Sequence, residues 1–456
     1  MPASPPQLVY DAGTLLIEGA VPPLLPPQFV WDARVEKYRA PAVLRRGSLG
    51  FFAKRHINIE DCCSQAKALD LHLSLALTSR PYQQAAITAW TDCGRCGTVV
   101  LPTGAGKTFV ALTAIADVGR STLVVAPTID LMNQWYSLLV DAFTCEIGIL
   151  GGGYHELRDI TVTTYDSAYR YAADYGNRFD LLICDEVHHL PAPSYRQIPL
   201  LSTAWFRLGL TATYERLDYT HNDLEFLLGP VVYKCGIDKL KGEYLADYEI
   251  IRIRTTLTDE ELARYRQCEN RYQAFLQGSG IKPFGTGWVD FLKASGYRPE
   301  ARDALLAKFE MQRIVINSER KLEVLDSLLK QHWQDKIIIF TEHNELVYRI
   351  SSEFLLPAIT HQTKARERKW ILDSFKGELL HAIVTSKVLN EGIDVPSAKI
   401  AIVLSGSASP REYLQRLGRI LRKGDGQKRA ILYEVVTSAT REMEVSARRR
   451  KTDAYT

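Results

Sequence analysis

LPTGAGKT, residues 101 to 108, follows a short apolar run and opens a stretch whose apolar residues have helical spacing. A glycine-containing turn between a strand and a helix is the setting in which backbone N–H groups and a helix N-terminus bind phosphate. Its glycines let the chain bend, its lysine can reach terminal phosphates, and its last threonine can bind Mg²⁺. The residues expected at the phosphates are Thr103, Gly104, Ala105, Gly106, Lys107 and Thr108. Leu101 replaces the first glycine of the full GxxxxGK[ST] pattern, so the match is to the core of that pattern.

Short, continuous apolar runs alternate with helical stretches on both sides of this loop. The first set comprises residues 98–101, 122–126, 160–165, 181–184 and 206–210. The second set comprises residues 336–341, 381–386, 399–405 and 430–436. Strands that are buried on both faces of a parallel sheet have this pattern, with helices as the connections. The sequence therefore predicts an α/β protein with two parallel sheets, one in each of two lobes.

An acidic pair stands at the end of the apolar run LLIC (residues 181–184). A carboxylate at such a strand end can hold Mg²⁺ opposite the phosphate-binding loop, and the next carboxylate can orient or deprotonate an attacking water. We therefore expect Asp185 to bind the metal and Glu186 to act on water. His188 and His189 follow, but adjacent side chains point in different directions and no third ligand cluster is evident. A zinc site is disfavoured for that reason.

The segment QRLGRILR, residues 415 to 422, lies within the second set of apolar runs. Hydrolysis of ATP needs charge neutralisation at the γ-phosphate, and Gln415, Arg419 and Arg422 are candidates for it. The two arginines are three residues apart, on one helical face. Taken alone, the segment also fits a solvated basic helix. Together with the phosphate-binding loop upstream, it favours a second lobe that contributes to catalysis.

Two further parts are indicated outside the lobes. Residues 8–18 have the pattern of a β-hairpin within a small N-terminal unit. Residues 255–320 are helical and charged, and four apolar residues form one helical stripe there. The stripe consists of Tyr265, Cys268, Tyr272 and Phe275. It fits a helical hairpin that packs its own core, or alternatively a surface on which nucleic-acid bases stack.

Composition excludes several classes of protein. The chain has 456 residues, a net charge of +3, 46% hydrophobic and 24% charged residues, which is typical of globular rather than disordered or collagen-like chains. No apolar run reaches the roughly 18 residues of a membrane span, and the first ten residues lack a signal-peptide pattern, so we expect a cytoplasmic protein without a membrane partner. Because the net charge is small, affinity for nucleic acid must come from local basic surfaces.

Only one pair among the eight cysteines, Cys93 and Cys96, has the spacing of metal ligands. No second pair is present to complete four ligands, so free thiols are favoured over a zinc or redox site.

Eight segments occur in the order typical of superfamily 2 helicases. They are RPYQ at 80–83, LPTGAGKT, APT at 126–128, DEVH at 185–188, LTAT at 210–213, IIIFT at 337–341, VTSKVLNEGIDVP at 384–396 and QRLGRILR. Through these segments, residues 80 to 422 resemble that superfamily. The DEVHHLP run, the HNELVYRIS segment, the GIDVP run and the short N-terminal unit look like archaeal XPB helicases in particular. The resemblance then covers nearly the whole chain.

This resemblance implies two RecA-like lobes that use ATP and Mg²⁺. It adds further residues to the ATP cleft, namely Arg80, Gln83, Gly392 and Asp394. Gln83 is expected to read adenine, while Thr211 and Thr213 are expected to couple hydrolysis to lobe movement. The expected parts are a damage-recognition-like module (1–75), RecA-like lobe 1 (76–240), a linker with a helical thumb-like insertion (241–325), RecA-like lobe 2 with the arginine fingers (326–440) and a basic tail (441–456).

Polar residues that follow successive strand ends are candidates for contacts with nucleic-acid phosphates. They are Thr128, Gln134, Thr163, Thr164, Thr341 and His343. Each hydroxyl taken singly also fits a helix cap or a turn. Just after LTAT, where the family carries an Arg-Glu-Asp motif, this chain departs from the pattern with Arg216, Leu217 and Asp218. Arg216 and Asp218 are still expected at the nucleic acid.

The resemblance implies an ATP-dependent 3′-5′ DNA helicase or translocase that acts on single strands and junctions. The expected setting is nucleotide excision repair or transcription-linked DNA opening, at the nucleoid of an archaeal-type cell, with a nuclease or a repair or transcription protein as partner. The alternative is an ATP-operated clamp or translocase on duplex DNA that recruits a nuclease and unwinds little by itself. Leu217 keeps this alternative open.

Overall fold

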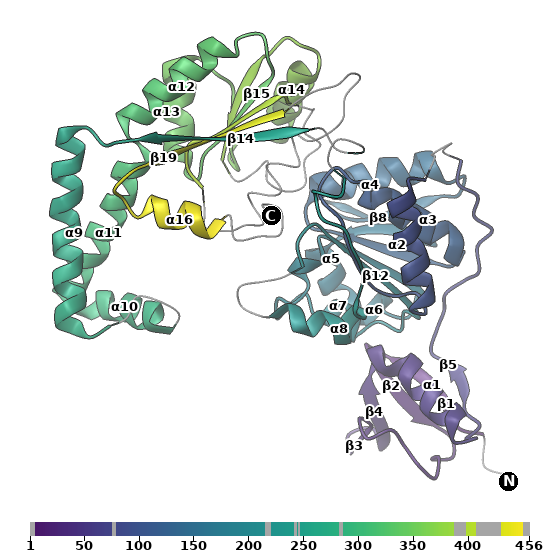
Figure 1. Ribbon diagram of the computed structural model, residues 1–456. Coiled ribbons are helices and arrows are strands. Elements are labelled where there is room, and N and C mark those ends of the chain that lie inside the picture. Colours follow the sequence, from purple (N-terminus) through teal and green to yellow (C-terminus); the bar gives the residue numbers. More distant parts are fainter. Residues whose placement is uncertain are drawn as a thin grey trace. The chain divides into compact units, whose positions relative to one another are not determined.

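The computed structural model divides the chain into two compact units, residues 1–239 and 240–456. The structure describes residues 5–74, 79–214, 220–240, 244, 247–281, 286–386, 398–406 and 430–449. Unit 1 holds a small N-terminal module and an α/β lobe, and unit 2 holds a second α/β lobe with a helical insertion (Figure 1).

The N-terminal module is a five-stranded sheet with the strand order β3-β4-β2-β1-β5 and one helix. Its elements are β1 (Gln7–Asp11), β2 (Thr14–Glu18), β3 (Val30–Asp32), β4 (Lys37–Pro41), the 3-10 turn η1 (Ala42–Leu44), α1 (Arg45–Lys54) and β5 (Glu60–Cys62). The predicted hairpin is confirmed, since β1 and β2 pair antiparallel. Ala12 and Gly13 form the turn of this hairpin, and both have positive φ, as a two-residue turn of type I′ requires. Leu8, Leu15 and Phe52 form the core of the module.

The lobe of unit 1 is built on an eight-stranded sheet with the order β13-β6-β12-β11-β7-β10-β8-β9. Its strands are β6 (Cys96–Val100), β7 (Thr122–Ala126), β8 (Ile147–Gly151), β9 (Tyr154–Glu156), β10 (Ile160–Thr164), β11 (Leu181–Asp185), β12 (Phe206–Thr211) and β13 (Val231–Lys234). All neighbours are parallel except β8 and β9. The five strands expected in this lobe are confirmed as β6, β7, β10, β11 and β12.

Helices precede and connect these strands, because parallel neighbours need crossover connections. They are α2 (Pro81–Asp92), α3 (Lys107–Val118), α4 (Ile129–Ala142), α5 (Tyr165–Arg170), α6 (Ala172–Tyr175), α7 (Gln197–Leu200) and α8 (Asp223–Leu228), with the 3-10 turns η2 (Val187–His189) and η3 (Thr220–Asn222). Because the carboxyl ends of parallel strands meet at one edge, the loops after β6, β7, β11 and β12 gather there.

The lobe of unit 2 has a six-stranded, all-parallel sheet with the order β14-β19-β18-β15-β17-β16. Its strands are β14 (Tyr248–Thr255), β15 (Ile337–Phe340), β16 (Ala358–Ile359), β17 (Ala382–Thr385), β18 (Ile400–Val403) and β19 (Ala430–Thr437). Its helices are α12 (Glu319–Gln331), α13 (Asn344–Phe354), α14 (Ala365–Lys376) and α16 (Glu442–Arg449). The four expected strands of the second set are confirmed as β15, β17, β18 and β19.

Between β14 and α12 stands a helical insertion, seen as the α9–α11 column in Figure 1. It consists of α9 (Asp259–Ser279), α10 (Thr286–Tyr297) and α11 (Pro299–Ile316). The stripe on α9 is buried, with Tyr265, Cys268 and Tyr272 at most 5% exposed, and it packs against Phe291 and the alanines of α11. The first of the two alternatives is therefore correct for these three residues, because they form the insertion's own core and are not available for base stacking.

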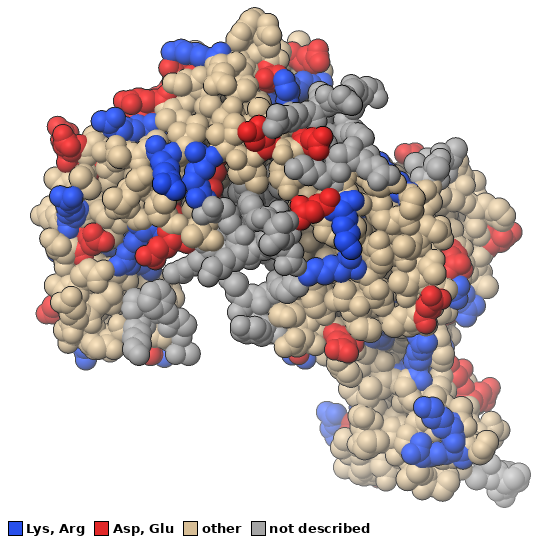
Figure 2. All heavy atoms as spheres, viewed as in Figure 1, with Lys and Arg blue, Asp and Glu red and all other residues tan. Residues whose placement is uncertain are grey.

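Basic and acidic side chains are interspersed on the face shown in Figure 2, and the described residues of that face form no large field of one sign. This agrees with the small net charge. In the part of the chain that the structure describes, no helix is both long and apolar enough to cross a membrane.

Candidate nucleotide-binding site

The phosphate-binding loop joins β6 to α3, as its sequence indicates. Gly104 and Gly106 have φ of +85° and +80°, in the left-handed region that favours glycine, and α3 begins directly afterwards at Lys107. A Cβ at Gly106 would also stand only 2.4 Å from Gln83 Nε2. Leu101 N donates to Thr211 O at 3.0 Å, which ties the start of the loop to the end of β12. Backbone shape thus favours glycine at both positions, and at Gly106 a side chain would also displace the Gln83 amide.

Opposite the loop, the end of β11 brings the acidic pair to the predicted lysine. Lys107 Nζ lies 3.7 Å from Glu186 Oε1, and both side chains are largely buried. Asp185 is the last residue of β11 and is 7% exposed. Three of the residues predicted from separate motifs therefore meet in one place.

Asp185 is held in a fixed orientation. Its Oδ2 accepts a hydrogen bond from Trp135 Nε1 at 2.9 Å, and its Oδ1 accepts one from the Glu186 backbone N–H at 2.9 Å. Tyr165, fully buried, donates its hydroxyl to the Asp185 carbonyl at 2.9 Å. Burial raises the pKa of the Asp185 carboxyl to about 6, and the Glu186 charge adds to the rise, while Lys107 and the Trp135 hydrogen bond oppose it.

This pKa predicts a pH dependence. Because the folded-state pKa of Asp185 lies above its ordinary value of 3.8, its contribution to stability is fully present below the ordinary value and is lost as the pH rises through about 6. In the metal- and nucleotide-free protein, we expect Tm to fall over that range in the wild type and less in Asp185→Asn. Mg²⁺-dependent binding of ATP should strengthen over the same range, because a metal ligand must be ionised. Thermal melts and ATP titrations measure both; identical pH profiles for the two proteins would contradict the prediction.

Glu186 is connected to the LTAT segment through a buried histidine. Its backbone is in the left-handed region, with φ of +46°, which is uncommon for a residue with a side chain and marks a constrained position. His188 Nδ1 lies 3.5 Å from Glu186 Oε2 and 3.1 Å from Thr211 Oγ1. The Thr211 hydroxyl donates to Thr213 O at 2.8 Å. A change at the carboxylate can therefore be transmitted to LTAT by side-chain contacts alone.

The rings of His188 and His189 lie 4.3 Å apart, so the expectation that these adjacent side chains point in different directions is wrong. Within the described ranges, no three His, Cys, Asp or Glu side chains are grouped as metal ligands would be. The eight cysteines are free thiols, and Cys96 Sγ accepts a hydrogen bond from Arg46 at 3.0 Å.

Gln83 lies at the loop but is engaged with the backbone. Its Nε2 donates to Ala105 O at 3.0 Å, and its Oε1 accepts from Arg80 N at 3.0 Å. Tyr82 donates its hydroxyl to the same Ala105 carbonyl at 2.7 Å. Nε2 also donates to Gly106 O at 3.5 Å, whereas Oε1 keeps a second lone pair. Reading adenine would therefore require Nε2 to exchange a loop carbonyl for the base, and this role stays a prediction.

The residues present fit a nucleotide phosphate with Mg²⁺. The loop bends through two left-handed glycines, and Thr103 Oγ1 is buried without a hydrogen-bond partner, as expected of a group that faces a ligand. Each oxygen of Asp185 accepts one hydrogen bond and retains a further lone pair for a metal. Thr108, at the start of α3, supplies the second expected metal ligand.

The residues predicted to contact nucleic acid differ in exposure and in their hydrogen bonds. Thr128 and Thr164 cap α4 and α5, since each Oγ1 accepts from a backbone N–H at 3.2 Å. Thr163 and Thr341 are 0% exposed, and their hydroxyls donate to backbone carbonyls. The structure does not support nucleic-acid contacts by the Thr163 and Thr341 side chains, because burial has already committed their hydroxyls.

Two candidates are exposed, Gln134 on α4 and His343 at the start of α13, and they stay predictions. Other candidates lie outside the described residues, namely Arg216, Leu217, Asp218, Gly392, Asp394, Gln415, Arg419 and Arg422.

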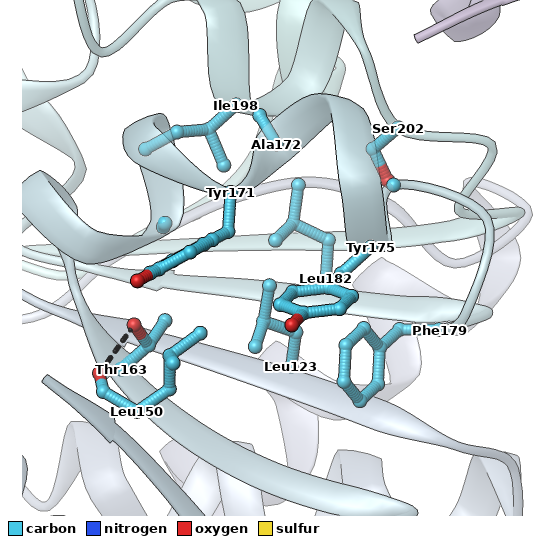
Figure 3. A pocket seen from close by; sticks show the side chains of 12 residues that line it. Leu123, Leu150, Thr163, Tyr171, Ala172, Tyr175, Phe179, Leu182, Ile198 and Ser202 are labelled. Atoms are coloured by element: carbon cyan, nitrogen blue, oxygen red, sulfur yellow. Dashed lines mark hydrogen bonds between the residues drawn. The ribbon is translucent and has the colours of Figure 1, made fainter. Parts of the chain in front are cut away.

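An apolar pocket in the lobe of unit 1 is distinct from this site. It lies between the sheet and the α5–α7 segment, with Tyr171 and Tyr175 among its lining residues (Figure 3). The bond from Thr163 Oγ1 to Leu150 O, 2.8 Å long, closes one side. The residues that line it include none from the phosphate-binding loop and neither Asp185 nor Glu186. This pocket is therefore a packing feature beneath the helices and no part of the nucleotide site.

Sequence reasoning missed two residues that support the site, Trp135 and Tyr165. Trp135 was not among the residues expected at the nucleotide, yet its indole N–H orients Asp185. Its spacing on α4 with Met132 and Leu139, all buried, indicated an inward-facing residue, and that was the available signal.

Sequence profiles of three families match this chain in order. The Xeroderma pigmentosum group B helicase damage recognition domain matches residues 8–62, the Type III restriction enzyme res subunit matches residues 76–216, and the ERCC3/RAD25/XPB C-terminal helicase matches residues 303–452. Among solved structures, the Hef helicase domain of Pyrococcus furiosus covers 81% of this chain and 97% of its own, with a TM-score of 0.50 and 17% identity. That likeness supports the fold of two RecA-like lobes.

Curated relatives extend the match to nearly the whole chain. The DNA 3′-5′ translocase XPB2 of Sulfurisphaera tokodaii is 41% identical over 97% of this chain and 99% of its own length. The DNA 3′-5′ helicase XPB of Mycobacterium tuberculosis is 33% identical over 82% of this chain and 63% of its own. The yeast general transcription and DNA repair factor IIH helicase/translocase subunit XPB/SSL2 is 28% identical over 84% of this chain and 44% of its own. This chain belongs to the XPB family of superfamily 2 helicases.

Proposed function

We propose that this protein is an ATP-dependent 3′-5′ DNA helicase or translocase that acts in nucleotide excision repair or in transcription-linked opening of DNA. The observation that carries the proposal is the meeting of Lys107, Asp185 and Glu186 at the carboxyl edge of the unit 1 sheet, beside a loop shaped for phosphate. ATP supplies the free energy for movement along DNA, and its Mg²⁺ offsets phosphate charge.

Each group then has a role. Lys107 stabilises charge on the terminal phosphates, Thr108 and Asp185 hold the metal, and Glu186 orients or deprotonates the attacking water. Gln83 reads adenine with Arg80 beside it. From the second lobe, Gln415, Arg419 and Arg422 neutralise charge at the γ-phosphate, and Gly392 with Asp394 serves the cleft. These second-lobe roles rest on the family motifs.

A direct test measures ATP hydrolysis with and without single-stranded, forked and duplex DNA, together with unwinding of a fork that has a 3′ tail. The proposal expects hydrolysis that DNA stimulates and movement with 3′-5′ polarity. An ATPase rate that is indifferent to DNA would refute it, even if the rate were high.

The second candidate is a translocase or clamp on duplex DNA that recruits a nuclease and unwinds little alone. The departure at Leu217 favours it, because leucine lacks the charge and the hydrogen-bond acceptor of the family's glutamate. A repair nuclease or transcription protein is then the partner.

Leu217→Glu separates these two candidates. We expect weak unwinding by the wild-type protein alone, and several-fold better unwinding in the variant at unchanged ATP turnover, because the glutamate can order Arg216. Fork unwinding and ATP hydrolysis are measured on the same preparations. A variant that gains no unwinding and melts at a lower temperature would instead place Leu217 in the packing of the lobe.

A further inference from the structure

Three neighbouring strands of unit 1 carry the nucleotide site at their carboxyl ends. β6 leads into the phosphate-binding loop, β12 ends at Thr211, and β11 ends at Asp185. They lie side by side in the order β6-β12-β11. Their amino ends therefore form one continuous edge on the far side of the sheet, about 17 Å from the site for a five-residue strand with a rise of about 3.3 Å per residue.

The N-terminal module binds this far edge through Arg45, the first residue of α1. Arg45 Nη1 donates to Asp180 Oδ1 at 3.3 Å and to Thr203 O at 3.1 Å. Asp180 directly precedes β11, and its side chain is only 4% exposed. The other side of the guanidinium pairs with Asp61 of the module at 2.8 Å. One buried arginine thus joins the module to the start of the strand that carries Asp185 and leads to Glu186.

Arg46 makes the corresponding contact with β6. Its Nη1 donates to Gly94 O at 2.9 Å and to Cys96 Sγ at 3.0 Å, and Cys96 is the first residue of β6. The guanidinium groups of Arg45 and Arg46 stand 5.4 and 5.6 Å from the centre of the Trp205 ring. Trp205 directly precedes β12. The pair therefore contacts the starts of all three strands.

Further contacts fix the module in this position. Tyr10 of β1 donates its hydroxyl to Ala173 O at 2.8 Å and to Leu201 O at 3.1 Å. Asp180 also accepts from Arg120, which precedes β7, at 2.9 Å, and from Ser64 at 3.0 Å. Buried, charge-assisted bonds with several partners hold one geometry better than exposed pairs do.

We propose that the N-terminal module is a fixed part of the motor lobe and controls its rate of ATP hydrolysis, with Arg45 as a positioning residue. Arg45 holds the start of β11 and Arg46 holds the start of β6. A displacement of one start against the other would therefore move Asp185 and Glu186 relative to the phosphate-binding loop, which follows β6. A ligand that binds the module and shifts these strand starts would thereby change the rate of ATP hydrolysis. This inference rests on the proposed ATPase function.

The test compares steady-state ATP hydrolysis of the full-length wild type, Arg45→Met and Arg34→Met with saturating single-stranded DNA. Arg34 has an exposed side chain, pairs with Asp32 within the module and serves as the matched control. In Arg45→Met, we expect kcat to fall about tenfold, because a misplacement of catalytic groups by about 1 Å can cost up to about 100-fold in rate. KM for ATP should change little, because the glycines and Lys107 of the loop are untouched. Arg34→Met should equal the wild type.

Thermal melts and circular dichroism establish the folded fraction of each variant. If Arg45→Met does not fold, Tyr10→Phe takes its place; it removes one hydroxyl between module and lobe and should lower kcat about twofold. Wild-type kcat in a folded Arg45→Met, or a loss that only follows the folded fraction, overturns the inference and leaves the proposed function intact. Absence of hydrolysis in the wild type would instead remove the proposed function itself.

Discussion

Lys107→Ala is expected to lower DNA-stimulated ATP hydrolysis at least about 10³-fold, to the background of the assay, because it removes the cation that faces developing charge on the phosphates. Its Nζ lies 3.7 Å from Glu186 Oε1, and its side chain is 11% exposed. The fold should survive, since Lys107 is the first residue of α3 and alanine is the best helix former.

The loss of this lysine should also change the binding of ATP, which can be measured without hydrolysis. Lys107 lowers the raised pKa of Asp185, so its removal should move the pH dependence of Mg²⁺-ATP binding to higher pH. Lys67→Ala is the matched control, because Lys67 pairs with Asp159 at 3.5 Å, away from the loop. Turnover is measured with and without DNA, and near-normal hydrolysis in Lys107→Ala would end the assignment of the loop.

Local patterns predicted the parts of this protein that depend on short stretches of chain. Buried parallel strands and the TGAGKT turn are such features, because strand burial and backbone bending depend on the types of a few consecutive residues. The convergence of Lys107 with Asp185 and Glu186 was also predictable, since carboxyl ends of parallel strands share one edge of a sheet.

Contacts between distant segments were not predictable in the same way. Trp135 and Asp185 lie 50 residues apart, and Arg45 and Asp180 lie 135 apart, so only the packing of whole elements brings them together. Thr163 and Thr164 illustrate the limit most directly. These adjacent threonines look alike in sequence, but one hydroxyl is buried against Leu150 O and the other caps α5. Successive side chains of a strand point to opposite faces of the sheet, and the position of the strand in the sheet determines which threonine points to which face.

Glu186→Gln is expected to bind ATP with Mg²⁺ nearly as well as the wild type and to hydrolyse it about 10³-fold more slowly, as for loss of a general base. Glutamine has the size of glutamate and can take the same backbone conformation, so Asp185 keeps its hydrogen bonds to Trp135 and to the residue 186 N–H. The carboxylate that is expected to orient or deprotonate water is removed, whereas the expected metal ligand stays.

Single-turnover hydrolysis and equilibrium binding of ATP should be measured side by side on Glu186→Gln, Asp185→Asn and Glu156→Gln, the last an exposed glutamate on β9 that serves as control. Asp185→Asn should lose Mg²⁺-dependent binding, because its carboxylate is the expected ligand and the amide is a weaker one. If Glu186→Gln lost binding while Asp185→Asn kept it, the two roles would be exchanged.

A further expectation follows from the contact of His188 with both Glu186 and Thr211. In Glu186→Gln, His188 loses its negatively charged neighbour. We therefore expect the ATP-bound variant to accumulate before hydrolysis, with the LTAT segment in its unchanged position. DNA should then stimulate ATP hydrolysis by the variant less than it stimulates hydrolysis by the wild type.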